Sequence, residues 1–378
     1  MIILIGSLLA MFYVFLLLGK KGKTAADFVL MAWMLLMAMH LLVFYSYTTK
    51  LYEKYPFVLG LDMAFPMMHA VFLFLYVKLL TSEDQIFHWF DYLHFMPSIL
   101  IYIYMIPFMA MERTEKLLYF NNIKQNESVF LGIVLIIVIL SGIAYIGLSL
   151  IMLHHHSKTI VNRFSFTEQI NLNWMKRLIY GMLIIWTIVI FTFFTENIFG
   201  FELPGGGDYY IFHAVILFVF FLGFYGIRQT AVFTNYNRFA EATDTVEVAE
   251  IQERYKKSGL KDSQIEELKE KLEQLMTIQK LYLEPKLSLD DVASKLDIHP
   301  NYLSQLINSH FNKNFFEFIN QFRVQEFKRI AMDPSLKHYS ILALAFDAGF
   351  SSKSTFNTVF KKYSGITPSE YVSSIDNH

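Results

Sequence analysis

The sequence contains no cysteine, which excludes a disulfide framework, a thiol nucleophile and a cysteine-based zinc site. Charged residues are also scarce: they make up 17% of the 378 residues, whereas soluble globular proteins usually carry about 25%. The shortage is confined to the N-terminal part, because residues 1–230 contain 27 charged side chains and residues 231–378 contain 38. The net charge of −1 gives no overall indication of a polyanionic partner. Near Arg228 the composition therefore changes from one suited to lipid to one suited to water.

The N-terminal part contains seven apolar stretches, each long enough to cross about 30 Å of hydrocarbon at roughly 20 residues per span. They lie near residues 2–19, 27–47, 57–80, 93–111, 129–153, 178–199 and 209–227. The first stretch has the length of a signal peptide, but its positive charges, Lys20, Lys21 and Lys23, follow the apolar run instead of preceding it. We therefore predict a seven-helix transmembrane domain over residues 1–228, embedded in a lipid bilayer.

The orientation of this domain follows from the Lys and Arg residues of its short loops, which are enriched on the cytoplasmic side of membrane proteins. With seven spans, the loops on the same side as the C-terminus hold ten such residues and those on the opposite side hold five. This ratio predicts an N-terminus outside and a C-terminal part in the cytoplasm.

Five polar side chains are expected at membrane depth, where each is costly unless it has a partner. They are His40, Asp62, His69, Glu196 and His213. Asp62 and His69 are seven residues apart, so on one helix they would share a face. Two interpretations stay open: the groups pair internally and hold helices together, or they form a pocket for a ligand or a proton. We expect no cofactor and no metal site.

Residues 229–275 are predicted to be a linker that contains an amphipathic helix. An apolar seam with heptad-like spacing consists of Ile265, Leu268, Leu272 and Leu275. The seam either packs on its own C-terminal domain or pairs with the same helix of a second protomer to form a homodimer. Proteolysis within residues 229–260, which would release a soluble fragment, is a further hypothesis.

Residues 276–378 contain two consecutive helix-turn-helix patterns. In the first, Ser288 and Asp291 form a capping-box-like start to a helix that ends near Leu296. After a short turn, Pro300 suits the first position of a second helix, which runs to about His310.

The second pattern consists of a helix over Ser340–Ala348, a turn at Gly349 and a helix over Ser352–Tyr363. Between the two patterns, Asn314–Met332 carries an apolar stripe and predicts a spacer helix of about 27 Å. Such a spacer can place two recognition helices about one DNA turn apart, roughly 34 Å. We therefore predict that one chain occupies two successive major grooves of double-stranded DNA.

At these residues the chain resembles the AraC/XylS-type DNA-binding domain. The resemblance lies in Leu289-Asp-Asp-Val-Ala, in Asn301-Tyr-Leu-Ser and in the stretch from Ala345 to Tyr371, which includes Gly349-Phe-Ser and Gly365-Ile-Thr-Pro. It covers about a quarter of the chain. The whole arrangement resembles the membrane-bound members of this family in bacteria, which implies a multi-pass protein of the inner (cytoplasmic) membrane.

The resemblance implies which side chains of the two recognition helices face DNA. The expected DNA-contacting residues are Asn301, Ser304, Gln305, Lys353, Ser354, Asn357, Thr358, Lys361 and Lys362. Asn and Gln suit an adenine edge, and Lys353 suits the acceptors of guanine. Lys361 and Lys362 suit phosphates, as do, more weakly, Arg323, Lys328 and Arg329 on the spacer helix.

These features predict an all-α protein in which a seven-helix membrane bundle, a helical linker and a double helix-turn-helix domain follow one another. The function predicted from them is a non-enzymatic, membrane-tethered transcription regulator that couples an unknown signal in the bundle to gene expression. The alternative is a membrane transporter or enzyme with a regulatory helix-turn-helix appendage.

Overall fold

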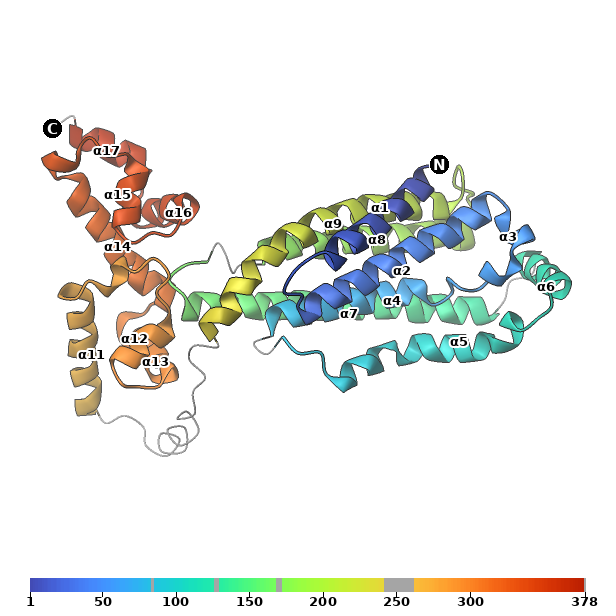
Figure 1. Cartoon of the computed structure of the whole chain (residues 1–378), viewed down its shortest axis with the longest axis horizontal. Helices are drawn as coiled ribbons and strands as arrows, with labels where there is room; N and C mark the ends of the chain where they lie inside the picture. The colour runs from blue at the N-terminus through green and yellow to red at the C-terminus, as the bar shows by residue number, and fades with distance from the viewer. Residues whose placement is uncertain (83–84, 126–128, 168–171, 241–261, 377–378) are drawn as a thin grey trace. The chain divides into compact units, whose positions relative to one another are not determined.

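The computed structural model describes residues 1–82, 85–125, 129–167, 172–240 and 262–376 (Figure 1). Within these ranges the chain is all-α: its residues form helices and turns, and the only bridge of β type joins Phe164 to Ser288. The predicted fold class is therefore confirmed. The chain forms two compact units, the first over residues 1–154 and 172–234, the second over residues 155–171 and 235–378.

The first unit is a bundle of long apolar helices. Its main helices are α1 (Ile2–Leu18), α2 (Ala25–Thr48), α4 (Phe65–Thr81), α5 (Met96–Met109), α7 (Val129–Arg163), α8 (Asn173–Phe193) and α9 (Gly207–Ala240). Short helices occupy the connections: α3 (Leu51–Lys54), η1 (Pro56–Val58), η2 (Trp89–Phe95), α6 (Arg113–Gln125) and the π-helix η3 (Phe194–Ile198). Each main helix overlaps one of the seven predicted apolar stretches.

Five described helical segments are long and apolar enough to cross a membrane: Ala25–Thr48, Trp89–Met109, Gly132–Arg163, Asn173–Glu196 and Gly207–Gly226. The other two apolar helices, α1 and α4, have 17 residues each, which is about 26 Å of helix.

The third apolar stretch differs from its predicted form, a helix over residues 57–80. The chain makes the short helix η1 and a series of turns before α4 begins at Phe65. Gly60 has φ +84°, a left-handed conformation that costs glycine little, and Pro66 suits the first turn of α4. Asp62 therefore precedes the helix that carries His69, so the reasoning that placed both on one helical face is wrong.

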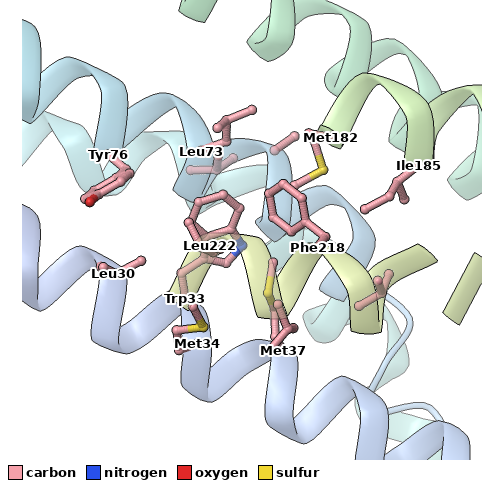
Figure 2. Packing of buried hydrophobic residues seen from close by; sticks show 14 of the residues in the cluster. Leu30, Trp33, Met34, Met37, Leu73, Tyr76, Met182, Ile185, Phe218 and Leu222 are labelled. Atoms are coloured by element: carbon pink, nitrogen blue, oxygen red, sulfur yellow. The ribbon is translucent and has the colours of Figure 1, made fainter. Parts of the chain in front are cut away.

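The core of the first unit lies where α2, α4, α8 and α9 meet. Figure 2 shows Trp33 and Met37 of α2 beside Phe218 of α9, with Leu73 of α4 and Met182 of α8 close by. Trp33 is fully buried, and its ring centroid lies 5.8 Å from that of Phe218. This aromatic contact joins α2 to α9 at the centre of the bundle.

The predicted boundary at Arg228 falls inside a helix, because α9 continues to Ala240. Residues 241–261, between α9 and the next described helix, hold 21 of the 47 residues of the predicted linker and most of the predicted cleavage region. That stretch lies outside the described residues. The amphipathic helix of the linker is α11, which spans Asp262–Thr277.

The C-terminal part of the second unit is a chain of short helices. They are α11, η4 (Leu281–Leu283), α12 (Leu289–Lys295), α13 (Pro300–Phe311), α14 (Phe315–Ala331), η5 (Pro334–Leu336), α15 (Ile341–Asp347), α16 (Lys353–Ser364) and α17 (Pro368–Asp376). The helix α14 contributes to two cores: Phe315 and Phe318 pack with α11, α12 and α13, whereas Val324 and Phe327 pack with α15 and α16. One helix thus links the two helix-turn-helix units.

The apolar seam of α11 packs into the first of these cores. Leu268, Leu272 and Leu275 are buried there, and Ile265 packs at the edge. Of the two alternatives for this seam, the structure shows contact with its own domain.

Candidate functional site

The first helix-turn-helix unit forms as its local sequence predicts. Ser288 accepts a hydrogen bond from the amide of Asp291, whose carboxylate accepts one from the amide of Ser288, and this capping box starts α12. The turn that follows contains Asp297 with φ +54°, and Pro300 stands at the start of α13. Leu303 anchors α13 in the core.

The expected DNA-contacting residues of α13 lie on its outer side. Asn301 and Gln305 are exposed, whereas Ser304 is half-buried. The amide of Asn308 donates to the carbonyl oxygen of Ser304 at 2.8 Å and lies 3.3 Å from its Oγ. The outer face of α13 is therefore polar and carries hydrogen-bonding groups suited to base edges.

The turn of the second helix-turn-helix unit contains Gly349, which has φ +90°. A Cβ at this position would lie 2.8 Å from the Cα of Leu283 and closer still to the carbonyl oxygen of Tyr282. Only glycine fits both the backbone angle and this contact with η4. Ser352 then caps α16 by accepting from the amide of Thr355 at 3.1 Å.

The expected contact residues of α16 are all exposed, whereas Phe356 and Phe360 on the opposite face are buried in the second core. The exposed residues are Lys353, Ser354, Asn357, Thr358, Lys361 and Lys362. The helix therefore presents a polar and basic outer face.

The two lysines at the end of α16 differ in their surroundings. The ammonium of Lys362 lies 2.6 Å from Glu317 Oε1, and this hydrogen bond raises the pKa of Lys362. The same ion pair lowers the pKa of Glu317. Lys362 thus joins α16 to the start of α14 and has part of its charge already neutralised, although its side chain is 60% exposed.

Arg323 is not a phosphate contact, so its assignment as a weaker DNA-contacting residue is wrong. Its side chain is fully buried, with a relative exposure of 0%. Burial lowers the pKa of Arg323 to about 9, which leaves the guanidinium protonated at neutral pH. The spacing carries a signal for this burial, because Arg323 lies four residues from both Ile319 and Phe327 on the core face of α14.

The other two weaker candidates on α14 are engaged at the surface. Lys328 lies over the rings of Phe360 and Tyr371, at 5.7 and 5.4 Å from their centroids. Arg329 donates to both carboxylate oxygens of Glu326 at 3.1 and 2.8 Å.

The guanidinium of Arg323 is surrounded by oxygen acceptors of three residues, which come from two segments of the chain. Nε donates to the carbonyl of Tyr282 at 2.8 Å, and Nη2 donates to the carbonyl of Glu284 at 2.7 Å. Nη1 and Nη2 donate to the carbonyl and the Oγ of Ser165, each at 3.0 Å. Ser165 is 158 residues away in sequence, and nothing in its local pattern predicts this contact.

The segment Phe164–Phe166 packs against the C-terminal part of the second compact unit. The amide and Oγ of Ser165 donate to the carbonyl of Leu287 at 3.1 and 2.7 Å, and Phe164 forms a bridge of β type with Ser288. The Nδ2 of Asn320 donates to the carbonyl of Ser165 at 3.0 Å. The segment thus adds a short strand-like edge immediately before the first helix-turn-helix unit.

In the first unit, two of the predicted membrane-depth residues meet directly. Trp33 Nε1 donates to His69 Nδ1 at 3.2 Å, and His69 Nε2 lies 3.0 Å from His40 Nδ1. Because Nδ1 of a neutral His69 accepts, its Nε2 carries the proton and donates to His40. The result is a directional chain of hydrogen bonds from Trp33 through His69 to His40.

Asp62 lies near His40 and His69, whereas Glu196 and His213 lie apart from them and have partners of their own. Asp62 Oδ1 accepts from Tyr47 Oη at 2.9 Å. Glu196 Oε1 accepts from the amide of Gly207 at 2.7 Å, at the start of α9. His213 lies 2.6 Å from the carbonyl of Tyr209 on its own helix.

Two adjoining cavities lie in this region of the first unit. One, the aromatic cavity, has a volume of about 590 Å³ and is lined from α2, α5, α6, α7 and α9. The other, the histidine cavity, has a volume of about 260 Å³ and includes His40 and His69 in its wall. Phe44, Tyr47, Asp62 and Asp208 line both cavities. Volumes of several hundred Å³ are typical of small-molecule sites.

Comparison with known proteins concerns the C-terminal part only. Residues 292–374 match the family described as "Helix-turn-helix domain". The chain is similar to the Msm operon regulatory protein of Streptococcus mutans, with 30% identity over 92 residues, which are 24% of this chain and 32% of that protein. No solved structure matches the chain.

Two further relatives are similar over the same part of the chain. The uncharacterized HTH-type transcriptional regulator YpdC of Escherichia coli is 33% identical over 94 residues, 25% of this chain and 32% of that protein. The transcriptional regulatory protein HptR of Staphylococcus aureus is 28% identical over 86 residues, 23% of this chain and 32% of that protein. The chain thus spans about a third of the length of these relatives. Together with the two helix-turn-helix units joined by α14, these matches identify the C-terminal part of this chain as a helix-turn-helix domain of the AraC type, a DNA-binding module.

Proposed function

We propose that the protein is a membrane-tethered, sequence-specific transcription regulator, and not an enzyme, that couples a signal in its helical bundle to DNA binding. The C-terminal helix-turn-helix domain and the regulators it resembles support the DNA-binding role. Five apolar helices of sufficient length support the tether. All seven apolar helices would span the bacterial inner membrane, with α1 and α4 as its shortest spans. The excess of basic residues in alternate loops favours a cytoplasmic DNA-binding domain.

The proposed DNA interface consists of the outer faces of α13 and α16. Both helices pack on α14, whose 17 residues extend about 26 Å, so the spacer is of the right order to serve two successive major grooves. Asn301, Gln305 and Lys353 are the proposed base-reading residues. Lys361 is the stronger proposed phosphate contact, because Lys362 already forms an ion pair.

The observation that carries the coupling is the position of Ser165. Helix α7 belongs to the first unit up to His154, and its last residues, with the segment that follows, belong to the second unit. That segment contributes two acceptor atoms to the buried guanidinium on α14, the helix on which both recognition helices pack. We propose that displacement of α7 moves Ser165 relative to Arg323 and so alters the arrangement of α13 and α16.

For this route to act as a switch, the signal must bind the two arrangements with different affinity. The seam of α11 offers a weaker route, because its leucines are buried in their own domain. A homodimer through Ile265, Leu268, Leu272 and Leu275 would have to withdraw those side chains from that core. We therefore do not propose it as the resting state.

The coupling is tested by Ser165→Pro in the full-length protein. Proline removes the amide that donates to Leu287 and displaces the segment from Arg323. We expect the affinity of the full-length protein in nanodiscs for its operator, identified by mapping DNA occupancy across the genome, to change by at least tenfold.

The matched control is Thr159→Ala on α7, the helix that leads into this segment, since the Thr159 hydroxyl donates to the His155 carbonyl one turn earlier. An unchanged affinity in Ser165→Pro would contradict the coupling but not the DNA-binding role. Failure of the wild-type protein to occupy specific genomic sites would contradict its proposed role as a transcription regulator.

A further inference from the structure

The aromatic cavity is walled by rings that come from four helices. Tyr104 of α5 and Phe130 of α7 stack with centroids 4.1 Å apart, and Phe108 of α5 lies 5.5 Å from Tyr119 of α6. Aromatic faces carry partial negative charge and attract cations within about 6 Å. The wall therefore favours a ligand that is apolar over most of its surface and carries a positive charge.

Among the described residues that line the cavity, the charged groups are two carboxylates, Asp62 and Asp208, and there is no Lys, Arg or His. Asp62 accepts from Tyr47, but a carboxylate has about four acceptor positions and so retains capacity for a ligand. In a site of low dielectric, two carboxylates repel an anion strongly and stabilise a cation.

A basic residue, Lys116, contacts one ring of this wall and directs its ammonium to a backbone carbonyl. Lys116 lies with its ammonium 5.4 Å from the centroid of Phe108, and that ammonium donates to the carbonyl of Met109 at 2.9 Å. Lys116 is not among the residues that line the cavity.

From these observations we infer that the aromatic cavity binds a small organic cation, an amine or quaternary ammonium group on an apolar body. The carboxylates recognise the charge, the rings surround the ammonium, and Met63 and Met105 accommodate the apolar body. This inference rests on the proposed function, since it names the class of signal that the regulator senses.

The test uses three probes that share a phenethyl body and differ in charge, with the purified full-length protein in nanodiscs. They are phenethyltrimethylammonium, its uncharged carbon isostere (3,3-dimethylbutyl)benzene, and the anion 3-phenylpropanoate. Saturation-transfer NMR and equilibrium dialysis measure binding. We expect the ammonium to bind at least tenfold more tightly than either of the others. Equal binding of the ammonium and its isostere, preference for the anion, or binding of none of the three overturns the inference.

Variants then locate the site. Asp62→Asn and Asp208→Asn should each weaken binding of the ammonium at least tenfold, and Phe130→Leu should weaken it several-fold. Glu53→Gln is the matched control, because Glu53 is an exposed carboxylate that does not line the cavity. Size-exclusion profiles and helical content show that each variant is folded. Unchanged binding in both aspartate variants would place the ammonium elsewhere and overturn the inference.

The same preparations separate this inference from the regulator itself. Specific DNA binding without binding of the ammonium would contradict only the cavity assignment. Binding of the ammonium without specific DNA binding would contradict only the proposed function.

Discussion

Replacing Arg323 with methionine tests whether the buried guanidinium holds the segment around Ser165 in place. Methionine has a similar length and an apolar character, so it fills much of the same volume without donating hydrogen bonds. The carbonyl of Tyr282 loses the guanidinium donor, and the carbonyl of Glu284 retains only a hydrogen bond of 3.3 Å from the Leu287 amide.

The expected loss of stability follows from the four hydrogen bonds that the Arg323 guanidinium donates to Tyr282, Glu284 and Ser165. A buried carbonyl left without a donor costs about 1–3 kcal/mol, and each partly compensated acceptor costs less. Removal of the cation also removes the cost of burying it, which reduces the sum. We therefore expect the segment and the loop before α12 to be destabilised by about 2–4 kcal/mol. Ser165→Ala should cost only about 1 kcal/mol, because the Ser165 amide still donates to Leu287.

Hydrogen exchange followed by mass spectrometry on the full-length protein in nanodiscs measures this effect locally. For Arg323→Met, residues 281–288 and the amide of Ser165 should exchange roughly 30 to 700 times faster than in the wild type. The double variant with Ser165→Ala should cost less than the sum of the single changes, because the two residues share hydrogen bonds. Exchange within threefold of the wild type at residues 281–288 would refute the structural role assigned to Arg323.

Three further perturbations have defined outcomes. Gly349→Ala should destabilise the C-terminal domain by more than about 3 kcal/mol in urea unfolding, because it combines a left-handed backbone angle with overlap on Leu283; a cost below 1 kcal/mol would contradict this. The pKa of Glu326 is lowered to about 2, mainly by a hydrogen bond from Arg329, whose side chain is exposed. The ionised carboxylate therefore stabilises the fold above pH about 4.5, and about 2 kcal/mol of the free energy of unfolding should be lost as the pH falls towards 2. Glu326→Gln should remove that part of the acid sensitivity. Lys361→Ala should weaken binding to all DNA sequences and reduce by about 1 the slope of log affinity against log salt concentration. Lys362→Ala should reduce this slope less, because Lys362 forms an ion pair with Glu317; equal slopes in the two variants would contradict this difference.

The local signals of the C-terminal domain predicted its helices closely. The capping box of Ser288, the proline at the start of α13 and the turn at Gly349 each act within a few residues, so the sequence alone specifies them. The exposure of the outer residues of α16 agrees with the resemblance to the AraC/XylS-type domain, which implied that these side chains face outward. Contacts with DNA at these residues stay a prediction.

Long-range contacts account for what the sequence did not predict. The contact between Ser165 and Arg323 spans 158 residues, and neither residue has a local pattern that names its partner. The third apolar stretch was misread because hydropathy does not detect a turn at Gly60 inside an apolar run. The pairing of His40 with His69 depends on how α2 and α4 pack, which periodicity on either helix does not determine.

The shared hydrogen bonds of Ser165 and Arg323 also constrain how the protein is made. Ser165 leaves the ribosome 158 residues before Arg323, which at about 5–20 residues per second is a delay of roughly 8–30 s. During that time the segment after α7 has no guanidinium to dock against. For the same reason, cleavage within residues 229–260 would separate the C-terminal domain from Ser165. A released domain would expose part of the buried surface around Arg323, so a freed fragment and the tethered protein would differ in stability as well as in location.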